Sequence, residues 1–100
     1  MVKHIIIWTL KDTLTVEEKQ NVKLEAKKNL ESLVGKIDGL LELKIQTDFL
    51  STSSGEMMLD STFENFEALK AYAIHPEHQA VANEFVRPYT NSRSCVDFEI

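Results

Sequence analysis

The first third of the chain predicts a strand followed by a long helix. Residues 2–10 are rich in β-branched side chains, a composition typical of a strand. A helix is expected to begin at Thr15, because Thr15 and Glu18 have the spacing of a capping box. Gly35 is a natural left-handed cap for its end. Between these two points, apolar residues recur at helical spacing: Val22, Ala26, Leu30, Leu33 and Val34.

The remaining pattern predicts two strands, a broken helix and a last strand. Residues 41–49 alternate between apolar and polar, and after a polar turn residues 56–63 form the second arm of an expected hairpin. Asn65 is suited to cap the start of a helix. This helix must break before Pro76, and Pro76 fits the first turn of a new helix. Residues 93–100 alternate again and predict the last strand.

This order of elements, βαββαβ, is that of an α+β ferredoxin-like sandwich, with the first strand in the middle of an antiparallel sheet. Helices on one side of the sheet cannot cover both faces of that strand. A second copy packed against the open face is the commonest solution, so we expect a homodimer that forms a dimeric α/β barrel. Both faces of the first strand are apolar, with Ile6, Trp8 and Leu10 on one and Ile5 and Ile7 on the other.

Composition limits the classes of function. One hundred residues, 43% of them hydrophobic, form one globular domain over residues 1–100. The net charge of -5 disfavours nucleic acid as a partner, and the short apolar run at residues 5–8 is no membrane span or signal segment, so a cytoplasmic location is expected. The single cysteine, Cys95, has no ligand spacing around it, and we expect neither a metal nor another cofactor.

The candidate chemistry gathers at the helix break, where Tyr72, His75 and His78 lie within seven residues. Histidine is the side chain most easily poised as a base near neutral pH, and a partly buried tyrosine donates a hydrogen bond to a carbonyl or enolate oxygen. The alternative is structural: Tyr72 is a core residue, His75 caps the helix that begins at Pro76, and His78 is a hydrogen-bonded buried imidazole.

Two residues on the strands are expected to approach this cluster. His4 lies on the same face as Ile6 and Trp8, and Asp97 lies on the last strand, which this topology places beside the first. An Asp97 carboxylate bonded to His78 fixes its tautomer and raises its basicity. The alternative for Asp97 is an ordinary carboxylate on an exposed edge strand.

Several segments together resemble the stress-responsive A/B-barrel (Dabb) family. They are residues 2–8, residues 63–69, Tyr72 with the His-Pro-Glu-His run at residues 75–78, and residues 96–98. The resemblance spans nearly the whole chain and implies a dimeric α+β barrel of ferredoxin-like protomers. The family includes plant stress-induced proteins and a plant polyketide cyclase, so membership does not by itself name a function.

In that cyclase a histidine is the general base of an aldol closure and a tyrosine holds the substrate carbonyl, and the resemblance places these roles on His78 and Tyr72. It also implies that Asp97 supports the base. The first helix departs from the aromatic character that the cyclase pocket would need for its substrate. The residues expected to bind substrate are His4, Ile6, Trp8 and His75.

Two classes of function therefore remain open. The favoured hypothesis is a dimeric barrel that binds a small apolar or carbonyl ligand or acts in a stress response. The alternative is an enzyme without a cofactor, either an acid-base catalyst with His78 as base, Asp97 orienting it and Tyr72 stabilising an oxyanion, or a monooxygenase.

Overall fold

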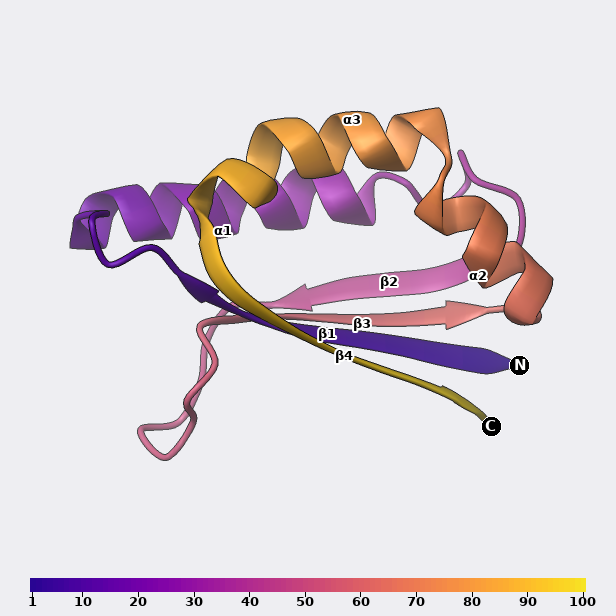
Figure 1. Cartoon of the computed structure of the whole chain (residues 1–100), viewed down its shortest axis with the longest axis horizontal. Helices are drawn as coiled ribbons and strands as arrows, with labels where there is room; N and C mark the ends of the chain where they lie inside the picture. Colours follow the sequence, from indigo (N-terminus) through magenta and orange to yellow (C-terminus); the bar gives the residue numbers. More distant parts are fainter.

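The structure, a computed structural model, describes residues 1–100 as an antiparallel sheet with helices on one face (Figure 1). The strand order is β2-β3-β1-β4, and every neighbouring pair is antiparallel. The predicted ferredoxin-like α+β fold is confirmed. Its elements are β1 (Val2–Leu10), α1 (Val16–Glu31), β2 (Leu40–Gln46), β3 (Met57–Phe63), α2 (Phe66–Ala73), α3 (Pro76–Phe85), the 3-10 helix η1 (Arg87–Tyr89) and β4 (Thr90–Glu99).

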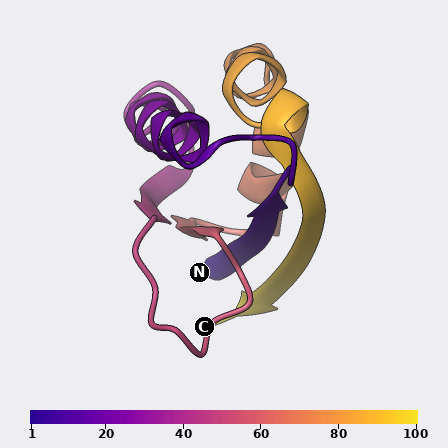
Figure 2. The ribbon, with the colours of Figure 1, turned by 90° about the vertical axis from the view of Figure 1, so that its left-hand side faces the viewer.

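The hydrophobic core lies between the sheet and the helices. Viewed along the strands, α1 and α3 run side by side over one face of the sheet (Figure 2). The strand positions that point toward them are buried at every second residue, as the alternation of a strand with one covered face requires. The buried residues of β1 are Val2, His4, Ile6, Trp8 and Leu10, and those of α1 are Val22, Ala26 and Leu30.

The three predicted helix starts are confirmed at atomic level. Thr15 and Glu18 form both hydrogen bonds of the capping box. The Asn65 side chain accepts a hydrogen bond from the backbone N–H of Ala68 at 2.8 Å. At α3, Pro76 occupies the first turn and His75 is the N-cap residue. The sequence therefore contains its own signals for where each helix begins.

The end of the first helix was predicted too late. Helix α1 ends at Glu31, with Ser32 as its C-cap, and the chain continues in turns up to Gly35. Gly35 does adopt a positive φ of 90°. The Val34 side chain is 40% exposed, because the turns carry it off the helical stripe that faces the sheet.

The second strand also differs from its predicted range. It begins at Leu40 and ends at Gln46, and its pairing with β3 shifts between Leu40 and Glu42. This bulge reverses the alternation at its start, so Leu40 is buried and Leu41 is 45% exposed. Phe49, predicted in the strand, lies in the loop that follows.

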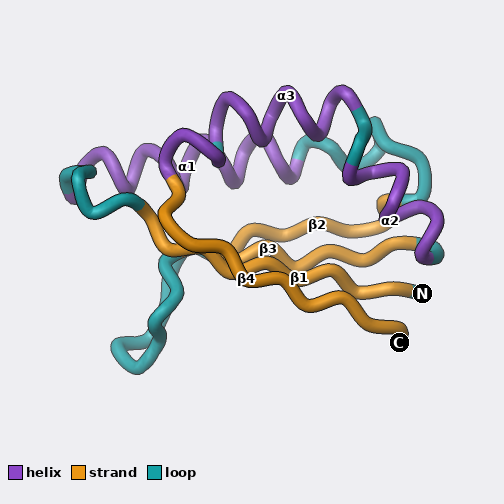
Figure 3. The backbone as a smooth tube through the Cα atoms, viewed as in Figure 1, coloured by secondary structure: helices purple, strands orange, loops and turns teal.

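The face of the sheet opposite the helices is bare in the protomer, and several apolar side chains of β1 and β4 lie exposed on it. Val96 is 57% exposed, Phe98 is 44% exposed and Ile7 is 42% exposed. The loop at residues 47–56 projects beyond this face, away from the helices (Figures 1 and 3). No helix of the chain has the length and apolar character that crossing a membrane requires.

Candidate functional site

The strand register brings His4 and Asp97 together. The two residues are direct partners across β1 and β4, and the carboxylate Oδ1 of Asp97 lies 2.5 Å from Nδ1 of His4. His4 is 7% exposed, whereas the Asp97 side chain is 40% exposed. In the neutral tautomer whose Nδ1–H donates to Asp97, the other ring nitrogen of His4 carries a lone pair, which a general base requires.

The predicted contact between Asp97 and His78 is wrong. Asp97 bonds His4 because the register of the two strands places them opposite one another. His78 lies on α3, and its Nδ1 is 3.2 Å from the carbonyl oxygen of Ala73. The imidazole that Asp97 contacts is therefore that of His4 and not that of His78.

Tyr72 links the two histidines through stacked and edge-on rings. Its ring stacks on that of His78 with centroids 4.1 Å apart, and it meets the rings of Phe63 and His4 edge-on at 5.0 and 6.3 Å. Tyr72 is only 2% exposed, and no protein atom hydrogen-bonds its hydroxyl. The tertiary structure thus gathers His4, Asp97, Tyr72 and His78 into one cluster.

Burial sets the protonation of two members of this cluster. Burial raises the pKa of Tyr72 well above its usual range, so the phenol stays protonated and acts only as a neutral donor. Burial lowers the pKa of His78, with the charges of Arg87 and His4 acting in the same direction, while a hydrogen bond to Ala73 opposes the shift. His78 is therefore neutral at pH 7.

The other predicted site residues pack in the core or cap a helix in the structure. Ile6 and Trp8 are each 5% exposed and belong to the hydrophobic core. Nδ1 of His75 accepts the backbone N–H of Glu77 at 3.1 Å, which is the capping role weighed above as the alternative. Ile6 and Trp8 therefore offer little free surface to a ligand within the protomer, whereas His75 is partly exposed.

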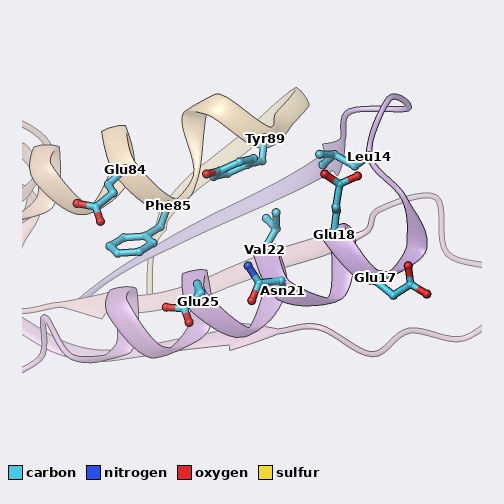
Figure 4. Close-up of a pocket in the computed structure, with 9 residues that line it drawn as sticks. All are labelled: Leu14, Glu17, Glu18, Asn21, Val22, Glu25, Glu84, Phe85 and Tyr89. Atoms are coloured by element: carbon cyan, nitrogen blue, oxygen red, sulfur yellow. The ribbon is translucent and has the colours of Figure 1, made fainter.

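A groove that the sequence did not reveal lies between the start of α1 and the end of α3 (Figure 4). Its volume is about 510 Å³, and none of the predicted site residues lines it. Nothing in the spacing of its carboxylates along the chain shows that two helices bring them together. The lining residues are Leu14, Glu17, Glu18, Asn21, Val22, Glu25, Glu84, Phe85 and Tyr89.

The sheet topology and the buried polar cluster define a small α+β protein of ferredoxin-like type, built on one covered and one bare sheet face. The chain belongs to the Dabb family, described as the stress responsive A/B barrel domain, whose sequence model matches residues 2–100. The resemblance read from the His-Pro-Glu-His run and the two terminal strands is thereby confirmed. No functionally curated protein matches this chain significantly.

Solved structures share the fold over nearly the whole chain. A dimeric protein of unknown function with a ferredoxin-like fold from Bacteroides fragilis is 34% identical, with a TM-score of 0.91 over 99% of this chain and 95% of that one. A Dabb family protein from Mesorhizobium loti is 19% identical, with a TM-score of 0.75 over 99% and 95%. A hydroxynitrile lyase from Passiflora edulis is 18% identical, with a TM-score of 0.77 over 99% and 92%.

Proposed function

We propose that this chain forms a homodimer and binds a small carbonyl-containing molecule at the cluster of Tyr72, His4 and His78. The observation that carries the proposal is the Tyr72 hydroxyl, a buried donor without a protein partner. Leaving such a group unpaired costs about 1–3 kcal/mol, and buried polar groups in folded proteins are rarely left so. A ligand oxygen that accepts from this hydroxyl removes the cost.

The surroundings of the hydroxyl favour a neutral acceptor of modest size. The phenol remains protonated because burial raises its pKa, and the adjacent His78 is neutral because burial lowers its pKa. The rings of Phe63 and His78 pack on Tyr72 and hold it in place. A carbonyl oxygen fits such a rigid, uncharged donor better than a carboxylate, whose burial beside aromatic rings is costly.

The homodimer is supported by the bare apolar sheet face and by the dimeric relative from Bacteroides fragilis. Val96→Lys places a charge on this face, and we expect it to convert the dimer to a monomer in size-exclusion chromatography with light scattering. Ile74→Lys is the matched control, because Ile74 is 80% exposed on the other side of the molecule, at the end of α2. A wild-type chain that elutes as a monomer contradicts the dimer.

Ligand binding is tested with a panel of small ketones, aldehydes and β-diketones by ligand-observed NMR and calorimetry. Compounds that bind the wild-type chain are expected to bind Tyr72→Phe about two- to tenfold more weakly, the value of one neutral hydrogen bond. Tyr89→Phe, which removes a phenol from the groove between α1 and α3, is the control. Binding that weakens in the control variant alone assigns the ligand to that groove instead.

A second candidate function, acid-base catalysis on a carbonyl compound, is favoured by the hydrogen bond between Asp97 and His4. In this mechanism the free nitrogen of His4 removes a proton next to the carbonyl, and Tyr72 donates to the developing oxyanion. The lyase from Passiflora edulis supports catalysis on this fold. This base differs from His78, the residue that the family resemblance implied.

The two candidate functions are separated by turnover. We expect Asp97→Asn to lower any turnover strongly while leaving the binding of the same compounds within a factor of a few. Glu99→Gln is the matched control, because it removes a carboxylate two residues further along the same strand face. Binding with no turnover in the wild-type chain leaves the ligand-binding function and removes the catalytic one.

A further inference from the structure

We propose that His4, Cys95 and Asp97 form a binding site for a divalent transition-metal ion of the zinc class. The three side chains offer one imidazole nitrogen, one sulfur and one carboxylate oxygen, and these atoms all lie within 4.8 Å of one another. The inference concerns an ion and does not depend on the carbonyl ligand proposed for Tyr72.

The backbone of the sheet builds this triad. Asp97 lies directly opposite His4 in the pairing of β1 with β4, and Cys95 is opposite Ile6. Residues two apart on a strand point to the same face, so Cys95 and Asp97 project on the side of the sheet where the His4 ring lies. Direct and diagonal neighbours across two strands are close enough to share a ligand.

The distances between the three donor atoms approach those of a tetrahedral ion. Bonds of about 2.0–2.3 Å to nitrogen, oxygen and sulfur place the donor atoms about 3.3–3.6 Å apart. Cys95 Sγ lies 3.7 Å from His4 Nδ1 and 3.5 Å from Asp97 Oδ1. Only the third pair, His4 and Asp97 at 2.5 Å, must open by about 1 Å when an ion takes the place of their shared proton.

One ligand is fixed and the other two are free to adjust. The His4 ring is buried and held by edge-on contacts with Phe63 and Tyr72. Cys95 and Asp97 lie on β4, an edge strand whose residues are exposed along almost its whole length. The Asp97 carboxylate can therefore swing by the required distance without moving the core, and solvent reaches the site.

The chemistry of the donors selects the class of ion. A thiolate and an imidazole suit zinc and its neighbours in the first transition row, whereas magnesium and calcium bind through oxygen alone. One thiolate, one carboxylate and one neutral imidazole balance the two charges of the ion. Three protein ligands leave a fourth position for water or a small molecule, as in catalytic zinc sites.

The sequence does not reveal this site, because its residues lie far apart along the chain. His4 and Asp97 are 93 residues apart, and no short metal-binding motif contains either of them. The expectation that Cys95 has no metal-binding partners rested on its neighbours in sequence. The register of β1 with β4 supplies those partners in space.

The test uses the 100-residue chain without an affinity tag, titrated with ZnCl₂ by calorimetry and with CoCl₂ by absorption spectroscopy. We expect one ion per chain, with a cobalt spectrum that shows tetrahedral d–d bands and a thiolate charge-transfer band. Cys95→Ser removes the charge-transfer band. Asp97→Asn weakens zinc binding at least about tenfold, since even groups outside the first ligand shell contribute that much.

Glu99→Gln is the control for the loss of one negative charge on this strand face, and it is expected to bind zinc as the wild-type chain does. Circular dichroism of each variant shows that the fold is kept. The proposal is overturned if the wild-type chain binds no zinc at millimolar concentration. It is equally overturned if binding is unchanged in Cys95→Ser and Asp97→Asn, which would assign the ion to other groups such as His75.

Discussion

Replacing Tyr72 with phenylalanine removes one buried hydroxyl and leaves the ring in place. The ring keeps its contacts with Phe63 and His78, and the hydroxyl has no hydrogen-bond partner in the protein to lose. An unpaired buried polar group costs about 1–3 kcal/mol, so the ligand-free variant should be more stable than the wild-type chain. Even about 1 kcal/mol raises the Tm of a 100-residue domain by about 4–8 °C.

The assay is thermal unfolding by circular dichroism at one fixed protein concentration, because the stability of a dimer depends on concentration. Tyr89→Phe is the control, since its phenol is partly exposed and its removal should change stability by less than about 0.5 kcal/mol. A loss of 1 kcal/mol or more in Tyr72→Phe refutes the reasoning, because it shows that the hydroxyl is already paired in the ligand-free protein. The premise of the ligand proposal then fails with it.

Three further predictions concern stability. Gly35→Ala should lower the free energy of unfolding by about 1–2 kcal/mol in urea denaturation, because Gly35 has a left-handed φ of 90°. Gly39→Ala should lower it by about 1–3 kcal/mol more, because its φ is 83° and an added Cβ lies 2.5 Å from that of Ala68. Equal losses in the two variants contradict this. Burial lowers the pKa of His78 in the folded chain, so below about pH 6.5 the unfolded chain binds a proton there that the folded chain does not. Stability is therefore lost as the pH falls. An equal loss in His78→Gln argues against His78 as its cause. Asn65→Ala should cost about 0.5–2 kcal/mol and Asn65→Ser much less, and identical urea midpoints contradict the cap.

The fold was predictable because its signals are local. The capping box at Thr15, the cap at Asn65 and the proline at residue 76 each act within a few residues, and the helices begin where these signals predict. The errors fall at the ends of elements. Helix α1 ends at Glu31 rather than Gly35, and the bulge near Leu41 arises from the pairing of β2 with β3.

Four of the predicted site residues lie together in the structure, but their pairings were not predictable. His4, Tyr72, His78 and Asp97 do gather in one region, as the topology implied. Which carboxylate faces which imidazole depends on strand register, and a shift of one residue would have turned Asp97 to the opposite face of the sheet. The addition of Cys95 to this group depends on the same register.

The sequence alone determined the order of elements, the ferredoxin-like topology, the family and the apolar character of both faces of β1. These follow from periodicity, caps and short motifs, which act over a few residues. Only the tertiary structure decided that Asp97 binds His4, that the Tyr72 hydroxyl is buried without a partner, and that two helices enclose a groove. Each of these depends on how segments far apart in the chain pack together. Such packing does not produce a periodic pattern in the sequence from which it could be predicted.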